Sequence, residues 1–242
     1  MSEKDPSTNE DRMRAEFDLL ADEYHVQHKE NVAITGEDPE FFSEYKIADL
    51  ASLIADQELP CSSIFDFGSG IGNSLPYFRK YFPGSLISCG DVSSRSIEIA
   101  KARFPGEEKY VLIDDQIPLP DSSQDIVFSA CVFHHIPHES HNHWLQELRR
   151  ITRPGGLLVI YEHNPLNPLT VRAVNTCPLD VNAKLIIGRS MGKRATAGGW
   201  VNPKIDYKLF FPSILSSFRP FERHLSWLFL GAQYRMSARA PK

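Results

Sequence analysis

The sequence predicts an α/β fold built on a mostly parallel, doubly wound sheet with helices on both of its faces. Short, mainly apolar segments, such as residues 63–67 and 157–161, alternate with amphipathic stretches of helical length. Strands that are buried on both faces of a parallel sheet have this composition. A glycine-rich segment also follows the first apolar run directly, as in the strand-to-helix turns of doubly wound sheets.

The length of the chain limits the number of domains. Its 242 residues, 42% of them hydrophobic, suffice for one large core and hardly for two. We therefore expect a single domain over residues 1–242. It would consist of an N-terminal tail with two helices (1–60), a central core (61–163) and a C-terminal part that adds an insertion and the last strands (164–242).

Each element follows from the spacing of apolar residues. Helical spacing predicts N-terminal helices at residues 10–24 and 39–54. Strands are expected at 63–67, 86–89, 110–113, 125–130 and 157–161, with helices at 73–82, 93–104 and 139–151. After Glu162, a proline-punctuated loop (164–178) leads to a helix around 183–191 and to strands at 204–211 and 233–238.

Composition also indicates the compartment. The four cysteines stand far apart with no Cys-x-x-Cys pair, which fits neither a disulfide framework nor a zinc pattern and suits a reducing compartment. The first residues are acidic and polar, unlike a secretory signal, and no apolar run approaches the roughly 18 residues of a membrane span. We therefore expect a cytoplasmic protein with no membrane partner.

The glycine-rich turn after the first predicted strand carries the strongest functional signal. Gly68, Gly70 and Gly72 let the backbone approach a ligand, and Asp91 closes the next strand, where it can accept hydrogen bonds from ribose hydroxyls. The dinucleotide pattern GxGxxG needs glycine at position 73, which is Asn73. Asp66 would repel a pyrophosphate and attract an ammonium or sulfonium group. A nicotinamide-dependent oxidoreductase is therefore the least favoured interpretation of these residues.

In these residues, the segment 61–163 resembles the class I S-adenosylmethionine-dependent methyltransferases. The resemblance implies a Rossmann-like three-layer fold, a seven-stranded sheet whose last strand is antiparallel, an N-terminal helical lid and S-adenosyl-L-methionine as cofactor. In the family the glycine turn holds the methionine part of the cofactor, the acid after the second strand holds the ribose, and an acid after the third strand flanks the adenine. The implied cofactor residues are Asp66, Gly68, Ser69, Gly70, Gly72, Asp91, Val92, Asp114 or Asp115, Ala130 and Cys131.

The residues after strands four and five are candidates for catalysis. Family members often carry a histidine pair just past strand four, here His134 and His135, and His135 is the preferred member. Methyl transfer to a hydroxyl needs correct alignment and a base, for which we predict His135, Glu162 and His163, with Tyr24 as a further candidate. His134, His138 and His141 would share one face of a helix as metal ligands, but Pro137 argues against a helix there, and no metal is predicted.

The flanking segments carry a weaker resemblance. Residues 17–24 are similar to the N-terminal helix of the ubiquinone and menaquinone methyltransferase group, which covers the cofactor pocket. Phe17 and Phe41 are expected to pack their helices. The segments 162–168, 175–180 and 231–234 resemble a bacterial subgroup of small-molecule methyltransferases. Candidate substrate-binding residues are Tyr24, Tyr45, Lys46, Asn164, Asn167, Arg172, Asn175 and Trp200.

The predicted reaction is methyl transfer to a small molecule, most favourably at oxygen. Methylation at carbon or nitrogen and a non-catalytic cofactor-binding module remain as alternatives. No nucleic-acid partner is expected, because the segment after strand four lacks the Asn-Pro-Pro-aromatic signature of base methylation and the net charge is −5. That charge divides into −11 over residues 1–60, −3 over 61–163 and +9 over 164–242.

The basic C-terminal part allows two interpretations. Either its cations favour an acidic acceptor, or they form a basic surface that offsets the acidic N-terminal part. The cations in question are Arg172, Lys184, Arg189, Lys193 and Arg194.

Overall fold

The computed structural model describes residues 36–242 and contains a seven-stranded sheet in the order β3-β2-β1-β4-β5-β7-β6. The helix expected at 10–24, with Tyr24 and Phe17, lies outside the described residues. The strands are β1 (Ser63–Phe67), β2 (Leu86–Asp91), β3 (Lys109–Leu112), β4 (Gln124–Ala130), β5 (Thr152–His163), β6 (Val201–Lys208) and β7 (Gln233–Arg239).

The strand directions confirm the predicted topology. β1 is parallel to β2 and β4, and β4 is parallel to β5, whereas β7 runs antiparallel to both β5 and β6. The chain turns from one half of the sheet to the other between β1 and β4. Ligands of doubly wound sheets bind at such a switch point, outside the carboxyl ends of the strands.

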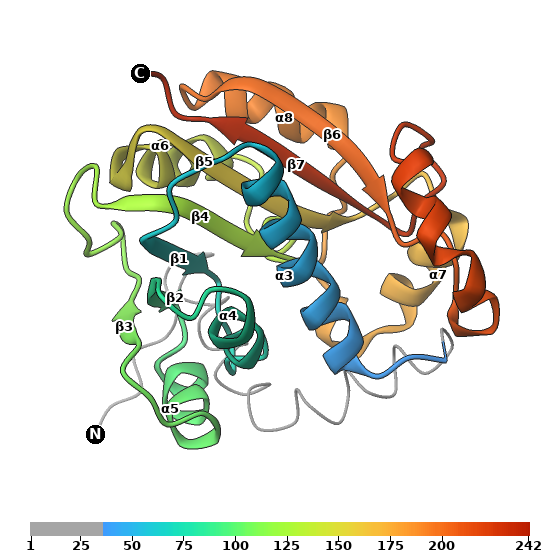
Figure 1. Cartoon of the computed structure of the whole chain (residues 1–242), viewed down its shortest axis with the longest axis horizontal. Helices are drawn as coiled ribbons and strands as arrows, with labels where there is room; N and C mark the ends of the chain where they lie inside the picture. Colours follow the sequence, from blue (N-terminus) through green and yellow to red (C-terminus); the bar gives the residue numbers. More distant parts are fainter. Residues whose placement is uncertain (1–35) are drawn as a thin grey trace.

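Helices cover both faces of the sheet, giving three layers (Figure 1). One face packs against α3 (Pro39–Asp56) and α4 (Leu75–Tyr81), and the other against α6 (His141–Ile151) and α8 (Gly188–Ala197). α5 (Ser94–Arg103) contacts β2 and β3. Alternate residues of each central strand enter opposite cores, as Phe128 and Val127 of β4 do. Burial on both faces explains why these strands are mainly apolar.

The C-terminal part departs most from the sequence prediction. The expected loop 164–178 contains α7 (Pro168–Thr176), followed by the 3₁₀ helix η2 (Pro178–Asp180). Pro168 occupies the first turn of α7, and the Asn167 side chain caps it by accepting from the N–H groups of Leu169 and Thr170. Proline is favourable at this position because the first N–H groups of a helix have no partner within it. It therefore starts a helix here, where the prediction read a break.

Three other boundaries of helices and strands differ from the predicted ones. α8 begins at Gly188 and not near residue 183, because its buried residues Met191 and Ala195 form the face that packs into the core. β6 ends at Lys208, and residues 213–224 form the 3₁₀ segment η3 (Ser213–His224). β5 begins at Thr152, so the segment predicted as a turn before residue 157 belongs to the strand. Within residues 36–242, the helices are too short or too polar for any of them to cross a bilayer.

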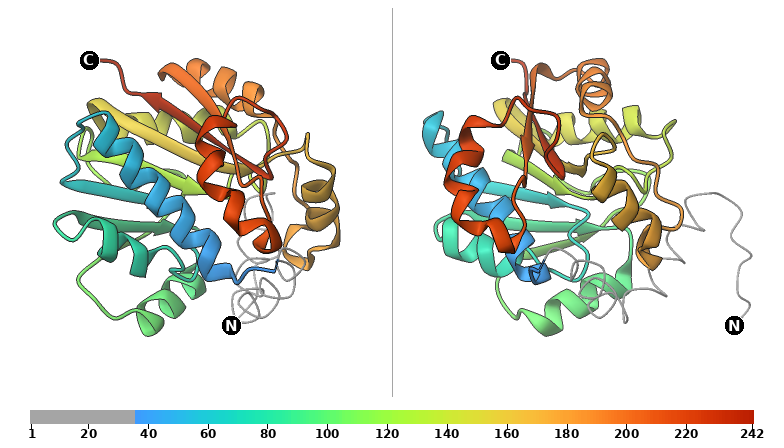
Figure 2. Two further views of the ribbon diagram at one scale, coloured as in Figure 1. Left: turned by 45° about the vertical axis from the view of Figure 1, so that its right-hand side comes forward. Right: turned by 90° about the vertical axis from the view of Figure 1, so that its right-hand side faces the viewer.

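Two segments of the C-terminal part lie beyond the carboxyl ends of the parallel strands. α7 and η3 stand at the end toward which those strands point (Figures 1 and 2). The chain therefore surrounds the carboxyl ends of β1, β4 and β5 with segments from α3, α7 and the region before η3.

Candidate functional site

A cavity of about 800 Å³ opens at the carboxyl ends of the strands. We distinguish two ends of it by their residues. The glycine end comprises Asp66, Gly68, Ser69, Gly70, Asp91, Val92 and Ile113, from the turns after β1, β2 and β3. The histidine end comprises His134, His135, His163, Arg172, Asp180 and Gln233, from the segments after β4 and β5 and the start of β7. Ala130 and Cys131 also line the cavity.

The glycine end depends on backbone that only glycine adopts readily. Gly68 and Gly70 have φ angles of 75° and 52°, in the left-handed region. A Cβ atom on Gly68 would lie 2.4 Å from a methyl carbon of Val132. The N–H groups of Gly68 and Ser69 both donate to the carbonyl of Gly90. This turn holds its backbone against the neighbouring strand and leaves an open wall toward the cavity.

Asp91 connects the glycine turn to the next helix. Its carboxylate accepts from the N–H of Gly70 at 2.7 Å and from the N–H of Ser93 at 2.9 Å. A carboxylate has about four acceptor positions, so Asp91 can hold the turn and still accept from a ligand in the cavity. Val92 lines the cavity beside it.

Asp66 is a buried acid in need of a positive partner. Its Oδ2 atom and the Ser69 hydroxyl are buried and have no hydrogen-bond partner among the described residues. Burial and the nearby charge of Asp91 raise the pKa of Asp66 to about 8, although Lys46 acts in the opposite direction. Buried charges are normally paired. The glycine end is thus suited to a cationic ligand with N–H donors, such as the ammonium group of an amino acid.

Glu162 organises the histidine end from behind. It is fully buried, and its carboxylate accepts from the N–H groups of Val132 at 3.0 Å and Phe133 at 2.8 Å. Its other oxygen lies 2.5 Å from Nδ1 of His134. Burial alone would raise the pKa of Glu162, but the contact with His134 lowers it overall. Glu162 therefore fixes the loop after β4 and does not line the cavity.

Asp180 joins the two histidines on the cavity side. Its Oδ1 atom lies 3.4 Å from Nε2 of His134 and 3.4 Å from Nε2 of His135. Burial lowers the pKa of His134, but the carboxylates of Glu162 and Asp180 outweigh this effect and raise it to about 10. Burial and the charge on His134 lower the pKa of His135 to about 3. At neutral pH the cavity therefore holds a charged His134 next to a neutral His135.

Cys131 lies between segments that are distant in the sequence. Its Sγ atom accepts from Nζ of Lys46 on α3 at 3.6 Å and from Nε2 of Gln233 on β7 at 3.8 Å. Burial raises the pKa of its thiol, but the charges of Lys46 and His163 outweigh this and lower it to about 7. Its φ angle of 59° is unusual for a residue other than glycine.

The structure brings together most of the residues expected to bind the cofactor, and fewer of those expected to bind the substrate. The predicted residues that line the cavity are Asp66, Gly68, Ser69, Gly70, Asp91, Val92, Ala130, Cys131, Lys46, His135, His163, Asn167 and Arg172. The described ones that do not line it are Gly72, Asp114, Asp115, Tyr45, Glu162, Asn164, Asn175 and Trp200.

Several of the residues outside the cavity have clear structural roles. The Tyr45 hydroxyl donates to Glu222 at 3.2 Å. The Asn164 amide donates to the carbonyls of Phe229 and Gly231, and the buried Trp200 indole donates to the carbonyl of Leu145 at 2.9 Å.

The remaining residues face other surroundings. Gly72 faces the packing of Leu75, Ala100 and Phe104. Asp114, Asp115 and Asn175 are exposed.

Some cavity residues escaped sequence reasoning. Asp180 stands in a segment that resembled a methyltransferase subgroup, but nothing in its spacing linked it to the histidines. Phe41 was expected to pack its helix, yet it lines the cavity, with the guanidinium of Arg219 4.3 Å from its ring centre. Of the five cations considered for an acidic acceptor, only Arg172 lines the cavity.

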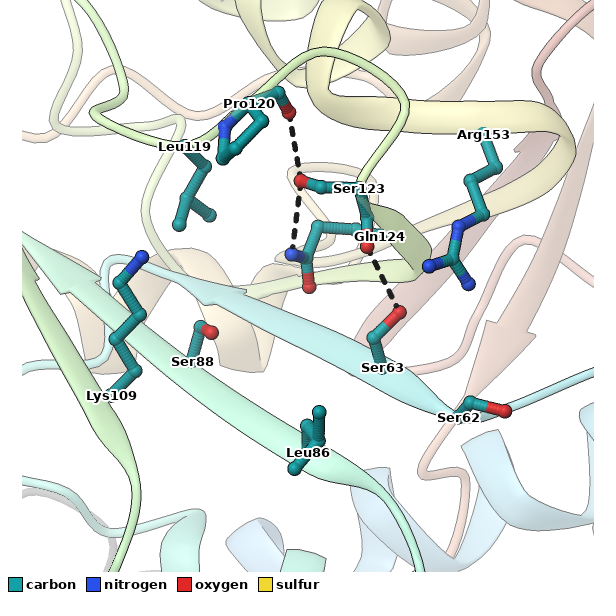
Figure 3. Close-up of a pocket in the computed structure, with 10 residues that line it drawn as sticks. All are labelled: Ser62, Ser63, Leu86, Ser88, Lys109, Leu119, Pro120, Ser123, Gln124 and Arg153. Atoms are coloured by element: carbon teal, nitrogen blue, oxygen red, sulfur yellow. Dashed lines mark hydrogen bonds between the residues drawn. The ribbon is translucent and has the colours of Figure 1, made fainter.

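A second hollow of about 290 Å³ lies at the opposite edge of the sheet, at the amino ends of β1, β2 and β4. Figure 3 shows its serine hydroxyls and the side chains of Lys109 and Arg153. Ser63 and Ser123 use their hydroxyls for hydrogen bonds to carbonyl groups, and Arg153 binds Asp125. These polar groups connect the strand ends to one another.

Known proteins with related sequences match the part of the chain that contains the glycine end. Residues 65–160 match a family described as "Methyltransferase domain". A tRNA N(3)-methylcytidine methyltransferase of Drosophila melanogaster is 32% identical over 133 residues, covering 50% of this chain and 40% of that protein. A ubiquinone/menaquinone biosynthesis C-methyltransferase of Desulfotalea psychrophila is 24% identical over 151 residues, covering 62% and 57%. The chain spans less than two thirds of the length of these relatives.

A solved structure shares the fold across most of the chain. The S-adenosylmethionine-dependent methyltransferase from Thermotoga maritima superposes with a TM-score of 0.65 at 17% identity, covering 94% of this chain and 99% of that one. The two curated relatives modify different molecules at different atoms by their names. Their similarity therefore leaves the methyl acceptor open.

Proposed function

Because the chain carries a methyltransferase domain of the class I S-adenosylmethionine-dependent family, we propose that it transfers a methyl group to a hydroxyl oxygen of a small molecule. The observation that carries the choice of oxygen is the position of His135 in the wall of the cavity, with its Nε2 3.4 Å from Oδ1 of Asp180. A hydroxyl acceptor must lose a proton as the methyl group is transferred, and a neutral imidazole can receive it.

The glycine end fits the cofactor on its own chemistry. Bound S-adenosylmethionine supplies a methyl group on a positively charged sulfonium. Asp66, buried and with an unpartnered oxygen among the described residues, would hold the ammonium of its methionine part. Asp91 would accept from the ribose hydroxyls, and Ala130 and Cys131 would offer backbone carbonyls. Gly68 and Gly70 leave room for the close approach.

The histidine end would hold the acceptor and its proton. As the proton moves to His135, Asp180 stabilises the new charge, in the manner of the acid of a catalytic triad. Glu162 keeps the loop in place through Val132 and Phe133. His163 is the second base candidate, and Lys46, Asn167 and Arg172 are the candidate substrate contacts that line the cavity. Glu162 itself is a positioning residue.

A small molecule is also the partner that we propose in place of a nucleic acid. The net charge of −5 gives no electrostatic preference for a phosphate backbone. The cavity is lined by both carboxylates and cations, among them Asp180 and Arg172. One domain over residues 1–242 and a cytoplasmic location complete the proposal.

The first test identifies the acceptor. Purified protein is incubated with cofactor carrying a labelled methyl group and with a cell extract, and the extract is divided into small-molecule, protein and RNA fractions. We expect the label in the small-molecule fraction, on an oxygen identified by mass spectrometry and base stability. Label confined to RNA or protein, or on carbon, would overturn the proposal.

The second test concerns the base. His135→Gln should lower kcat by about 10²-fold or more, as expected for loss of a general base, with the affinity for S-adenosylhomocysteine unchanged. His138→Gln changes an exposed histidine three positions away that does not line the cavity, and it should retain the parent kcat. Equal activity of the two variants would remove His135 from the mechanism. Binding of NAD in place of S-adenosylhomocysteine would refute the cofactor assignment.

A further inference from the structure

We propose that His134, His135 and Asp180 form a binding site for one divalent first-row transition ion in the wall of the histidine end. The site was not expected from the sequence, because Asp180 lies 45 positions after His135. Metal binding by these residues can be measured without any methyl transfer, so the proposal stands apart from the proposed function.

The three side chains supply a suitable set of donor atoms. Once the ion displaces the Nε2 proton of His134 to solvent, two imidazole nitrogens and one carboxylate oxygen form the type of ligand set that binds zinc in hydrolytic enzymes and iron(II) in oxygenases. One ligand atom from each of the three residues lies within 4.8 Å of the others. Cys131 and Cys177, the nearest candidates for sulfur ligands on the cavity wall, are not part of this group.

The distances between the ligand atoms fit tetrahedral coordination of an ion. Oδ1 of Asp180 lies 3.4 Å from Nε2 of both histidines. Two ligands at about 2.1 Å from a tetrahedral ion are about 3.4 Å apart, whereas neighbouring ligands of an octahedral ion at this distance are about 3.0 Å apart. Of the three pairs among these ligand atoms, two therefore already have the tetrahedral spacing, and the atoms of the third pair lie within 4.8 Å of each other.

The surroundings of His134 resemble the outer shell of a metal site. Glu162 lies 2.5 Å from Nδ1 of this histidine, so that Nε2 is the nitrogen directed to Asp180. Histidine ligands usually donate their second N–H to a carboxylate or carbonyl, which fixes the ring and its tautomer. Glu162 is itself held by two backbone N–H groups. The ring of His134 is 1% exposed, so its orientation is set before any ion binds.

Three protein ligands leave at least one coordination position open. All three residues line the cavity, so a further ligand can reach the ion from the cavity. This open position is typical of catalytic rather than structural zinc sites. If the proposed function holds, a hydroxyl of the acceptor could occupy it; with the ion bound, the ion would replace His135 and Asp180 in easing loss of the hydroxyl proton, because a bound cation lowers the pKa of a coordinated oxygen.

The test measures binding of zinc itself to the full chain. Protein treated with a chelator and dialysed is titrated with Zn²⁺ in the presence of a coloured zinc indicator. We expect one equivalent to bind to the parent. Asp180→Ala and His135→Ala should each weaken binding by at least tenfold. Glu162→Gln, which keeps the shape of the outer-shell side chain, should weaken it by about 10- to 100-fold.

Two matched controls identify the ligands. His138→Ala removes an exposed histidine of the same segment, and Cys131→Ala removes the thiol of the cavity wall, so both should bind zinc as the parent does. A second measurement uses Co²⁺, whose visible spectrum reports a tetrahedral N/O site and would show a thiolate ligand separately. Circular dichroism establishes that each variant is folded.

The outcomes separate this proposal from the proposed function. No stoichiometric zinc in the folded parent would mean that the three side chains form only a hydrogen-bonded cluster. Zinc binding that survives Asp180→Ala and His135→Ala, or that is lost with Cys131→Ala, would place the ion elsewhere, and both results overturn the proposal. Binding of S-adenosylhomocysteine is measured in the same samples, so a failed metal site with intact cofactor binding leaves methyl transfer standing.

Discussion

The two ends of the cavity are built in different ways. The glycine end is made by the carboxyl ends of β1, β2 and β3 and the turns that follow them. The histidine end gathers side chains from the loop after β4, the end of β5, α7, η2 and the start of β7. The first is held by backbone geometry within one supersecondary unit. The second exists only when distant segments meet.

Because of this difference, the glycine end can be recognised in the sequence, whereas the residues of the histidine end can differ from one protein to another. The glycine turn needs particular residue types because of its backbone angles, as at Gly68. The histidine end needs only complementary groups at the right distances, which many sequences can provide. Four changes test the comparison, and they are given in order of expected effect.

The largest effect is expected from Glu162→Ala. The substitution leaves two buried N–H groups and His134 without their acceptor, and breaking a buried charged pair in this way costs about 3–5 kcal/mol. Urea unfolding monitored by circular dichroism measures the loss. Glu139→Ala changes an exposed glutamate of the neighbouring segment and should alter stability by less than about 0.5 kcal/mol. Equal stability of the two variants would show that the histidine end is not held by Glu162.

A smaller loss is expected at the glycine end. Asp91→Ala removes the acceptor of Gly70 N–H and the acceptor that we propose for the ribose hydroxyls, so binding of S-adenosylhomocysteine should weaken by about 2 kcal/mol. Isothermal titration calorimetry measures this change. Asp115→Ala, at the exposed alternative position, is the control. A larger loss for Asp115→Ala would place the main carboxylate contact after β3.

Cofactor binding should also depend on pH through Asp66. Its pKa is raised to about 8 by burial and by Asp91, and a bound cation favours its ionised form, so binding below pH 8 must release a proton. Affinity for S-adenosylhomocysteine should therefore be constant above pH 8 and fall by up to about tenfold per pH unit below it. Asp66→Asn should bind weakly without this dependence. The same pH profile in the parent and in Asp66→Asn would assign the proton to another group.

The smallest effect is expected for Tyr45→Phe. Tyr45 was predicted to bind substrate, but its hydroxyl donates to Glu222 and it does not line the cavity. Loss of one hydrogen bond costs about 1 kcal/mol of stability, while kcat and KM should stay at the parent values. A raised KM would show that Tyr45 reaches the acceptor after all.

The central sheet was predictable because its signals are local. Strands buried on both faces must be mainly apolar, and the turns after them must leave room for the ligand. Residues 63–67 can therefore be recognised as a strand, and Gly68 as part of a ligand-binding turn, from the sequence alone. The prediction was less accurate for the C-terminal part, where a proline can either begin a helix or interrupt one. In the sequence alone, Pro168 indicates the interruption of an element. In the structure it begins α7, because the Asn167 side chain caps this helix.

The sequence by itself determined the fold class and the glycine turn, because each of these depends on residues that are neighbours in the chain, whereas the antiparallel last strand followed from the family resemblance. Only the tertiary structure decided which acid contacts the histidines from the cavity side. Glu162 adjoins His163 in sequence but points into the protein, whereas Asp180 reaches the cavity from η2. The physical reason is that side chains alternate across a strand and loops return from a distance. Contact at the histidine end therefore depends on packing between segments, which their order along the chain does not reveal.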